Sequence, residues 1–145
     1  MHHSVRFFTA CTLLLLNSNV WSTESLFRPG DYAITARTIM PNLAENLRYA
    51  AIQEQRCLHE ANLASVFPIL RHESFQGCRL DNERHQNTDV YYQLVCKSSQ
   101  VANGVAKLEL KPDRINGVLD IQMGGKNMTF SQRIEAQWQQ DCKPK

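Results

Sequence analysis

The stretch CRLDNERHQNTDVYYQLVC, residues 78–96, carries a cysteine at each end and has Asn87 at its midpoint. A polar run surrounds this midpoint, and such runs are typical of turns between strands. We therefore expect a β-hairpin in which Cys78 and Cys96 face each other at a spacing that permits a disulfide. The same register pairs two further positions, Leu80 with Leu94 and Asn82 with Tyr92.

The remaining cysteines predict a second crosslink. Cys11 lies in an N-terminal apolar run that we expect to be removed, which leaves four cysteines in the mature chain. A bond between Cys78 and Cys96 leaves Cys57 to pair with Cys142. Zinc sites use cysteines that are two to four residues apart, whereas 20, 17 and 45 residues separate these four. We therefore predict two disulfides, with neither a metal site nor a cofactor.

Most of the chain alternates between apolar and polar residues, as strands do when only one face is buried. Upstream, residues 31–39 predict a first strand that ends before Pro41. Downstream, glycines and the segment PDRING supply the turn signals between further strands. The alternation continues after the hairpin in VAKLELK (105–111), INGVLDIQM (115–123) and NMTFSQRIEAQW (127–138).

These patterns predict a mainly β fold, an antiparallel curved sheet or open barrel of meander topology with two disulfides. One short helix is expected in HEANLASVFPIL (59–70), where Pro68 breaks or kinks it. The apolar strand faces either fill the core or line a cavity for a ligand. The candidate residues for that role are Tyr92, Met123, Met128, Phe130 and Trp138.

The first 22 residues have the features of an export signal. Arg6 precedes the apolar run FFTACTLLLL, and small residues at Val20 and Ser22 suit cleavage after Ser22. Ten apolar residues span only ~15 Å as a helix, against the ~30 Å of a membrane core. We therefore predict a periplasmic protein with a signal peptide over residues 1–22, one β-rich domain over 23–145 and no transmembrane segment.

The charge balance of the chain argues against nucleic acid as a partner. The predicted mature chain has 15 basic and 14 acidic side chains, since Arg6 leaves with the signal, so its net charge is 15 − 14 = +1. The charges are spread along the chain and give no field that attracts nucleic acid. The partners we consider are a hydrophobic small molecule or an envelope protein.

Several segments together match a family pattern: RPGDYAIT (28–35), RCL (56–58), the cysteine hairpin, GVAKLELKPDRINGVLDIQMGGKNMTFSQRIEAQW (104–138) and DC (141–142). Through these features the chain resembles the domain of unknown function 3617, a family of small exported bacterial proteins. The resemblance covers about residues 26–142 and supplies no activity, substrate or catalytic residue. Taken alone, residues 42–58 have helical spacing and composition, whereas the resemblance implies a strand over about 52–58, so the structure of this segment stays open.

Catalytic patterns are weak. The chain has no Gly-x-Ser-x-Gly motif, and a disulfide sulfur is not a nucleophilic thiolate. His59 and His72 each precede a glutamate, but adjacent side chains point apart. Glu109 and Asp120 lie on the polar faces of neighbouring predicted strands, as surface carboxylates do. We therefore expect a non-catalytic binding or envelope-associated module; the alternatives are a small periplasmic hydrolase or an inhibitor of a lytic enzyme.

Overall fold

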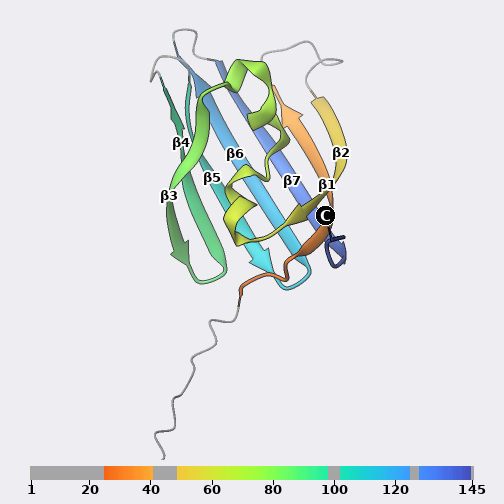
Figure 1. The fold of residues 1–145 in the computed structure, drawn as a ribbon. Helices are drawn as coiled ribbons and strands as arrows, with labels where there is room; N and C mark the ends of the chain where they lie inside the picture. Colours follow the sequence, from red (N-terminus) through yellow and green to blue (C-terminus); the bar gives the residue numbers. More distant parts are fainter. Residues whose placement is uncertain (1–24, 41–48, 98–101, 125–127, 145) are drawn as a thin grey trace, which may run out of the picture.

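The computed structural model describes residues 25–40, 49–97, 102–124 and 128–144, so the predicted signal peptide lies outside the described residues. Within them, seven strands form one open antiparallel sheet in the order β2-β1-β7-β6-β5-β4-β3 (Figure 1). The predicted mainly β, curved antiparallel fold is confirmed. The strands are β1 Gly30–Ile39, β2 Tyr49–Leu58, β3 Cys78–Gln86, β4 Asp89–Cys96, β5 Ala102–Lys111, β6 Arg114–Met123 and β7 Met128–Gln140.

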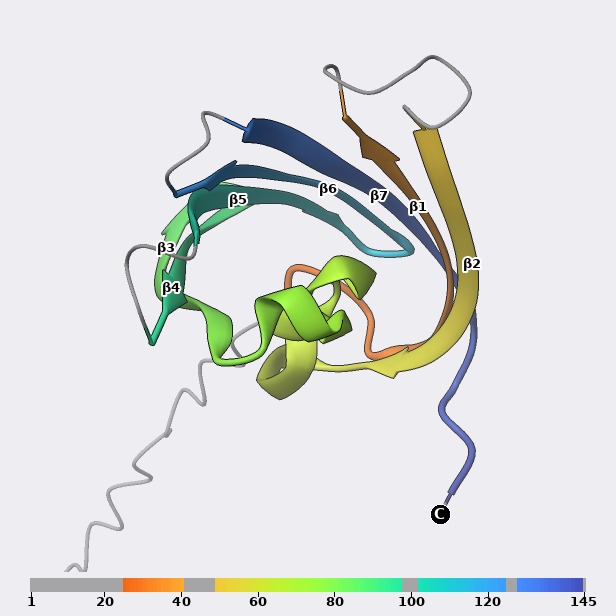
Figure 2. The same ribbon diagram turned by 90° about the horizontal axis from the view of Figure 1, so that it is seen from above.

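The last five strands form the predicted meander, each pairing with the next along the chain. The sheet then continues through β1, which pairs with β7 on one side and β2 on the other. Figure 2 shows the consequence: the sheet curls around the segment that links β2 to β3. We call the concave side of the sheet, which faces this segment, the inner face, and the convex side the outer face.

The linking segment forms three short 3-10 helices, where the sequence predicted one short helix. They are η1 Glu60–Ser65, η2 Pro68–Arg71 and η3 Glu73–Phe75. Pro68 begins η2, because proline is accepted in a first helical turn but breaks a continuing helix. The segment supplies core residues to the inner face, namely Leu63, Val66, Phe67 and Phe75.

Strand β2 occupies part of the segment 42–58, for which the sequence left both a helix and a strand open. All ten of its residues pair with β1, from Tyr49 opposite Ile39 to Leu58 opposite Gly30. The helical interpretation is therefore wrong for residues 49–58. The strand that the resemblance implied over about 52–58 is confirmed, and it begins three residues earlier, at Tyr49. Helix propensity is only a few tenths of a kcal/mol per residue, and a complete ladder of backbone hydrogen bonds outweighs it. Residues 42–48 lie outside the described part of the chain.

The cysteine hairpin begins in the predicted register, with Cys78 opposite Cys96 and Leu80 opposite Leu94. The register shifts by one residue before Arg84, so the predicted pairing of Asn82 with Tyr92 is wrong. Asn82 has φ 55°, a left-handed conformation that asparagine tolerates better than most residues, as a bulge requires. Both predicted disulfides, Cys78–Cys96 and Cys57–Cys142, are present.

Gly117 lies on the inner face of β6, where neighbouring side chains leave no room for a Cβ atom. A Cβ at this position would lie 2.6 Å from a methyl group of Leu108 and 2.7 Å from Ile134. The missing side chain therefore leaves room for these two neighbours on the flanking strands. Around it the inner faces of the strands build the core, whose fully buried side chains include Tyr32, Ile34, Leu58, Leu108, Ile115, Leu119 and Ile121.

Candidate functional site

A hollow of about 580 Å³ lies at one end of the inner face, between the sheet and the η2–η3 segment. Its volume is in the usual range for sites that bind small molecules. We call it the inner-face hollow and define it by its lining residues. These are Thr38, Met40, Ile52, Pro68, Ile69, Arg71, His72, Ser74, Phe75, Met123, Met128, Thr129, Phe130 and Gln132.

Two apolar side chains of the hollow are exposed although they belong to the inner face. Ile52 is paired with the buried Ala36 and is 43% exposed, and Met128 is paired with Met123 and is 44% exposed. Directly opposed residues of an antiparallel pair share a face of the sheet. Elsewhere the 3-10 segment covers that face, so these residues mark the area where the cover ends.

The hollow is lined by flexible as well as rigid apolar groups. Met40, Met123 and Met128 contribute thioether side chains, whose three rotatable bonds and polarisable sulfur adapt to irregular shapes. Phe75 and Phe130 form a rigid wall, with their ring centroids 5.8 Å apart in an edge-to-face arrangement. Such a lining accepts an apolar molecule without demanding one exact shape.

Gln132 is the buried polar residue that attaches the 3-10 segment to the sheet. Its side chain is 1% exposed; Nε2 donates to Thr38 Oγ1 at 2.9 Å, and Oε1 accepts from the Ile69 N–H at 3.1 Å. The sequence analysis did not identify this residue. The available signal was a polar side chain in the apolar row of β7, between Phe130 and Ile134.

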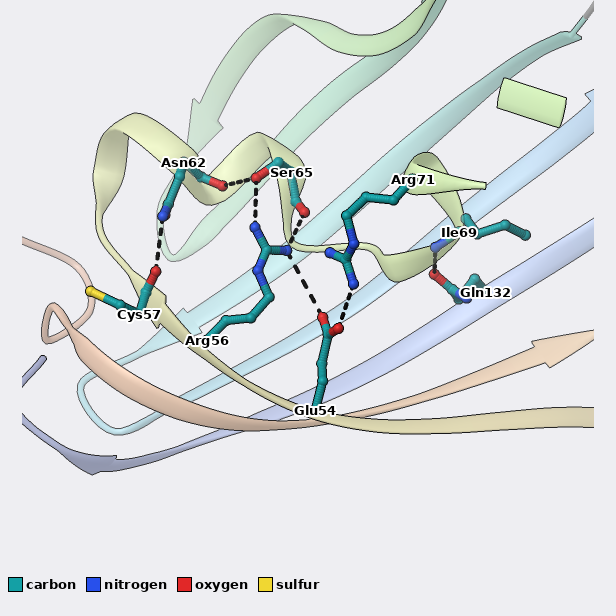
Figure 3. A network of polar contacts seen from close by, with 8 residues as sticks. All are labelled: Glu54, Arg56, Cys57, Asn62, Ser65, Ile69, Arg71 and Gln132. Atoms are coloured by element: carbon teal, nitrogen blue, oxygen red, sulfur yellow. Dashed lines mark hydrogen bonds and ion pairs between the residues drawn. The ribbon is translucent and has the colours of Figure 1, made fainter. Parts of the chain in front are cut away.

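A polar cluster next to the hollow holds the same segment against β2 (Figure 3). The Arg56 guanidinium donates to Ser65 O at 2.6 Å and to Ser65 Oγ at 3.1 Å. Glu54 accepts from Arg71, and its other oxygen is 4.0 Å from Arg56. Burial lowers the pKa of Arg56, the charge of Arg71 lowers it further, and Glu54 opposes both. Two guanidinium groups thus share one carboxylate, which leaves an excess of positive charge.

A second hollow, of about 480 Å³, contains a histidine–carboxylate pair at a different place in the fold. His85 Nε2 contacts Glu83 Oε1, but the two side chains are 54% and 49% exposed. Burial raises the pKa of Tyr92 above its usual range, and the charge of Glu83 and a hydrogen bond to it add to this effect. The pair is solvated, unlike the desolvated acid–base pairs of most catalytic sites.

The structure brings together only part of the candidate set. Met123, Met128 and Phe130 line the inner-face hollow, whereas Tyr92 is buried in the core at 3% exposure and does not line it. Trp138 also lies away from the hollow, under the guanidinium of Arg28 at 3.7 Å from the ring centroid. The remaining lining residues, which the sequence analysis did not single out, come mainly from β1, β2 and the 3-10 segment.

The carboxylates of Glu109 and Asp120, which the sequence placed on neighbouring strands, do not lie next to each other. Glu109 is opposite Asn116 in the sheet, and Asp120 is opposite Val105, so the two carboxylates lie several residues apart along β5 and β6. Across the described ranges, no group of three or more His, Cys, Asp or Glu side chains could hold a metal ion. The helices in these same ranges are all too short or too polar to cross a membrane.

Comparison with known proteins identifies a family but no activity. The family model described as "Protein of unknown function (DUF3617)" matches residues 27–142, which is most of the chain. Searches of curated proteins and of solved structures found no match.

Proposed function

Because the chain belongs to the DUF3617 family of proteins of unknown function, we propose a role from its structure: a non-catalytic module that binds an apolar small molecule in the inner-face hollow. One observation carries this proposal. The concave face of the sheet, which is core elsewhere, ends in uncovered apolar side chains around a hollow of ligand size. Filling the hollow would remove that apolar surface from water, at ~25 cal/mol per Å².

The structure offers less support for the two alternative functions, a hydrolase and an inhibitor of a lytic enzyme. A hydrolase would need a buried acid–base pair in a cleft, and the His85–Glu83 pair is about half exposed. An inhibitor would present an ordered loop with exposed aromatic side chains. Within the described residues, none of the large exposed hydrophobic side chains is aromatic; they are Leu26, Ile52, Val105 and Met128.

We place this binding role outside the cytosol, in the periplasm, after removal of residues 1–22. Two disulfides in one small domain support this location, because disulfides persist in oxidising compartments. The apolar N-terminal run is consistent with it.

The proposal is tested with Nile red, an uncharged dye whose fluorescence rises in apolar surroundings. The oxidised protein, residues 23–145, is titrated with the dye, and Ile52→Glu is compared with the parent. A charge at this exposed apolar position should weaken dye binding by about tenfold or more, because a buried charge without a partner is costly.

The matched control is Val105→Glu, which places the same charge at a 58% exposed apolar position on the outer face. We expect this variant to bind the dye as the parent does. Equal loss in both variants, or no saturable dye binding by the parent, would refute the proposed function.

A further inference from the structure

We infer that the inner-face hollow binds a single-chain amphiphile with an anionic head group, with the head at Arg71 and the hydrocarbon chain against the methionines and phenylalanines. This inference rests on the proposed function and adds the chemical class of the ligand. It depends on how charge and hydrogen-bond donors are distributed around the hollow.

Arg71 is the charged group of the lining, and much of its capacity to donate is unused. Its guanidinium has five N–H donors, of which one is bonded to Glu54. The side chain remains 46% exposed and lines the hollow. A carboxylate or phosphate at the mouth could therefore accept from the free N–H groups without breaking the contact with Glu54.

His72 and Ser74 add donors beside Arg71. His72 Nδ1 accepts from the backbone N–H of Ser74 at 3.2 Å, so in the neutral ring the proton is on Nε2. Both side chains are exposed and line the hollow. Arg71, His72 and Ser74 thus present a guanidinium, an imidazole N–H and a hydroxyl at one side of an apolar hollow, whereas the exposed Glu73 between them is not part of the lining.

No aspartate or glutamate is among the residues that line this hollow within the described chain. Glu54 lies outside the lining and is already engaged by Arg71, while Arg56 adds a second positive charge nearby. Among the described lining residues, the charge at the mouth is therefore the positive charge of Arg71, whereas the far wall is apolar. An uncharged hydrocarbon would pack only against the apolar wall, and an inorganic anion would bind only the donors at the mouth. An anionic amphiphile makes both kinds of contact.

Displacement of Nile red separates these ligands. Dodecanoate, dodecyl phosphate, dodecanol and inorganic phosphate are titrated against the dye-loaded protein, below their micelle concentrations. We expect dodecanoate or dodecyl phosphate to displace the dye at concentrations about tenfold lower than dodecanol, since a charge-assisted hydrogen bond typically contributes that much. Inorganic phosphate should not displace it. The better of the two anionic chains identifies the head group.

Three variants assign the preference to Arg71. Arg71→Gln should abolish the preference for the anionic chain while dodecanol still displaces the dye, which also shows that the variant is folded. Glu54→Gln should increase the preference, because it removes the carboxylate that competes for Arg71. Arg79→Gln removes another exposed arginine, also paired with a carboxylate, from β3 away from the hollow, and should leave the preference unchanged.

Failure of this inference is distinguishable from failure of the proposed function. If dodecanol binds but the anionic chains bind no better, or if the preference survives Arg71→Gln, the inference is wrong and the apolar site stands. If neither the dye nor dodecanol binds the parent protein, both are wrong.

Discussion

Gln132 illustrates how a single polar side chain positions the candidate site. It lies in the apolar row of β7 and uses both ends of its amide, one towards Thr38 on β1 and one towards Ile69 on η2. A buried amide is stable only when it is hydrogen-bonded, so the residue selects one position for the 3-10 segment on the sheet. That position sets where the covered inner face ends and the hollow begins.

Gln132→Leu is expected to lower the free energy of unfolding by about 2 kcal/mol, because the Ile69 N–H and the Thr38 hydroxyl lose their buried partner. Urea denaturation measures the change. Gln122→Leu, an exposed position on the outer face of β6, is the control and should stay within about 0.5 kcal/mol. Equal effects of the two substitutions would contradict the anchoring role of Gln132.

At the scale of elements, the curved sheet depends on close packing between neighbouring strands. Gly117 on β6 faces Leu108 on β5 and Ile134 on β7, and each neighbour reaches into the space where its side chain would be. Sequence alternation predicted these strands and their apolar faces, but the sequence analysis counted Gly117, the last residue of PDRING, among the turn signals. The need for a glycine arises from two neighbours on other strands, which a local pattern does not contain.

We expect Gly117→Ala to destabilise the protein by about 1–3 kcal/mol through overpacking, although alanine is the better strand former. Thermal unfolding followed by circular dichroism measures this loss. Val105→Ala on the outer face of β5, where the side chain is 58% exposed, should change the stability far less. A neutral or stabilising effect of Gly117→Ala would show that the sheet relaxes around the extra methyl group.

At the scale of the molecule, the two disulfides close loops of very different length. Cys57–Cys142 joins the end of edge strand β2 to the residues after β7, across a sequence separation of 85. Cys78–Cys96 staples one hairpin, with a separation of 18. In the chain-entropy model a longer closed loop restricts the unfolded chain more, so the first disulfide should contribute more stability.

Replacing Cys57 and Cys142 by alanine should therefore cost about 4–5 kcal/mol, and replacing Cys78 and Cys96 about 3 kcal/mol. Denaturant unfolding of the two double variants under oxidising conditions tests this order. The comparison is internally controlled, because each variant loses one disulfide and keeps the other. The reverse order would mean that native contacts around the hairpin, rather than loop length, dominate.

Local patterns in the sequence were sufficient for the strands after Cys78, the faces they bury and both disulfides. The strands and their faces depend on a two-residue period, and the hairpin disulfide depends on the spacing of two cysteines around a turn. The second disulfide then follows because Cys57 and Cys142 are the cysteines that remain in the predicted mature chain. The local pattern of residues 49–58 favoured a helix, and tertiary structure decided for a strand, because the decisive hydrogen bonds come from β1. It also decided the site. The inner-face hollow joins residues of β1, β2, β6, β7 and the 3-10 segment, and alternation tells which face is apolar but not where that face is left uncovered.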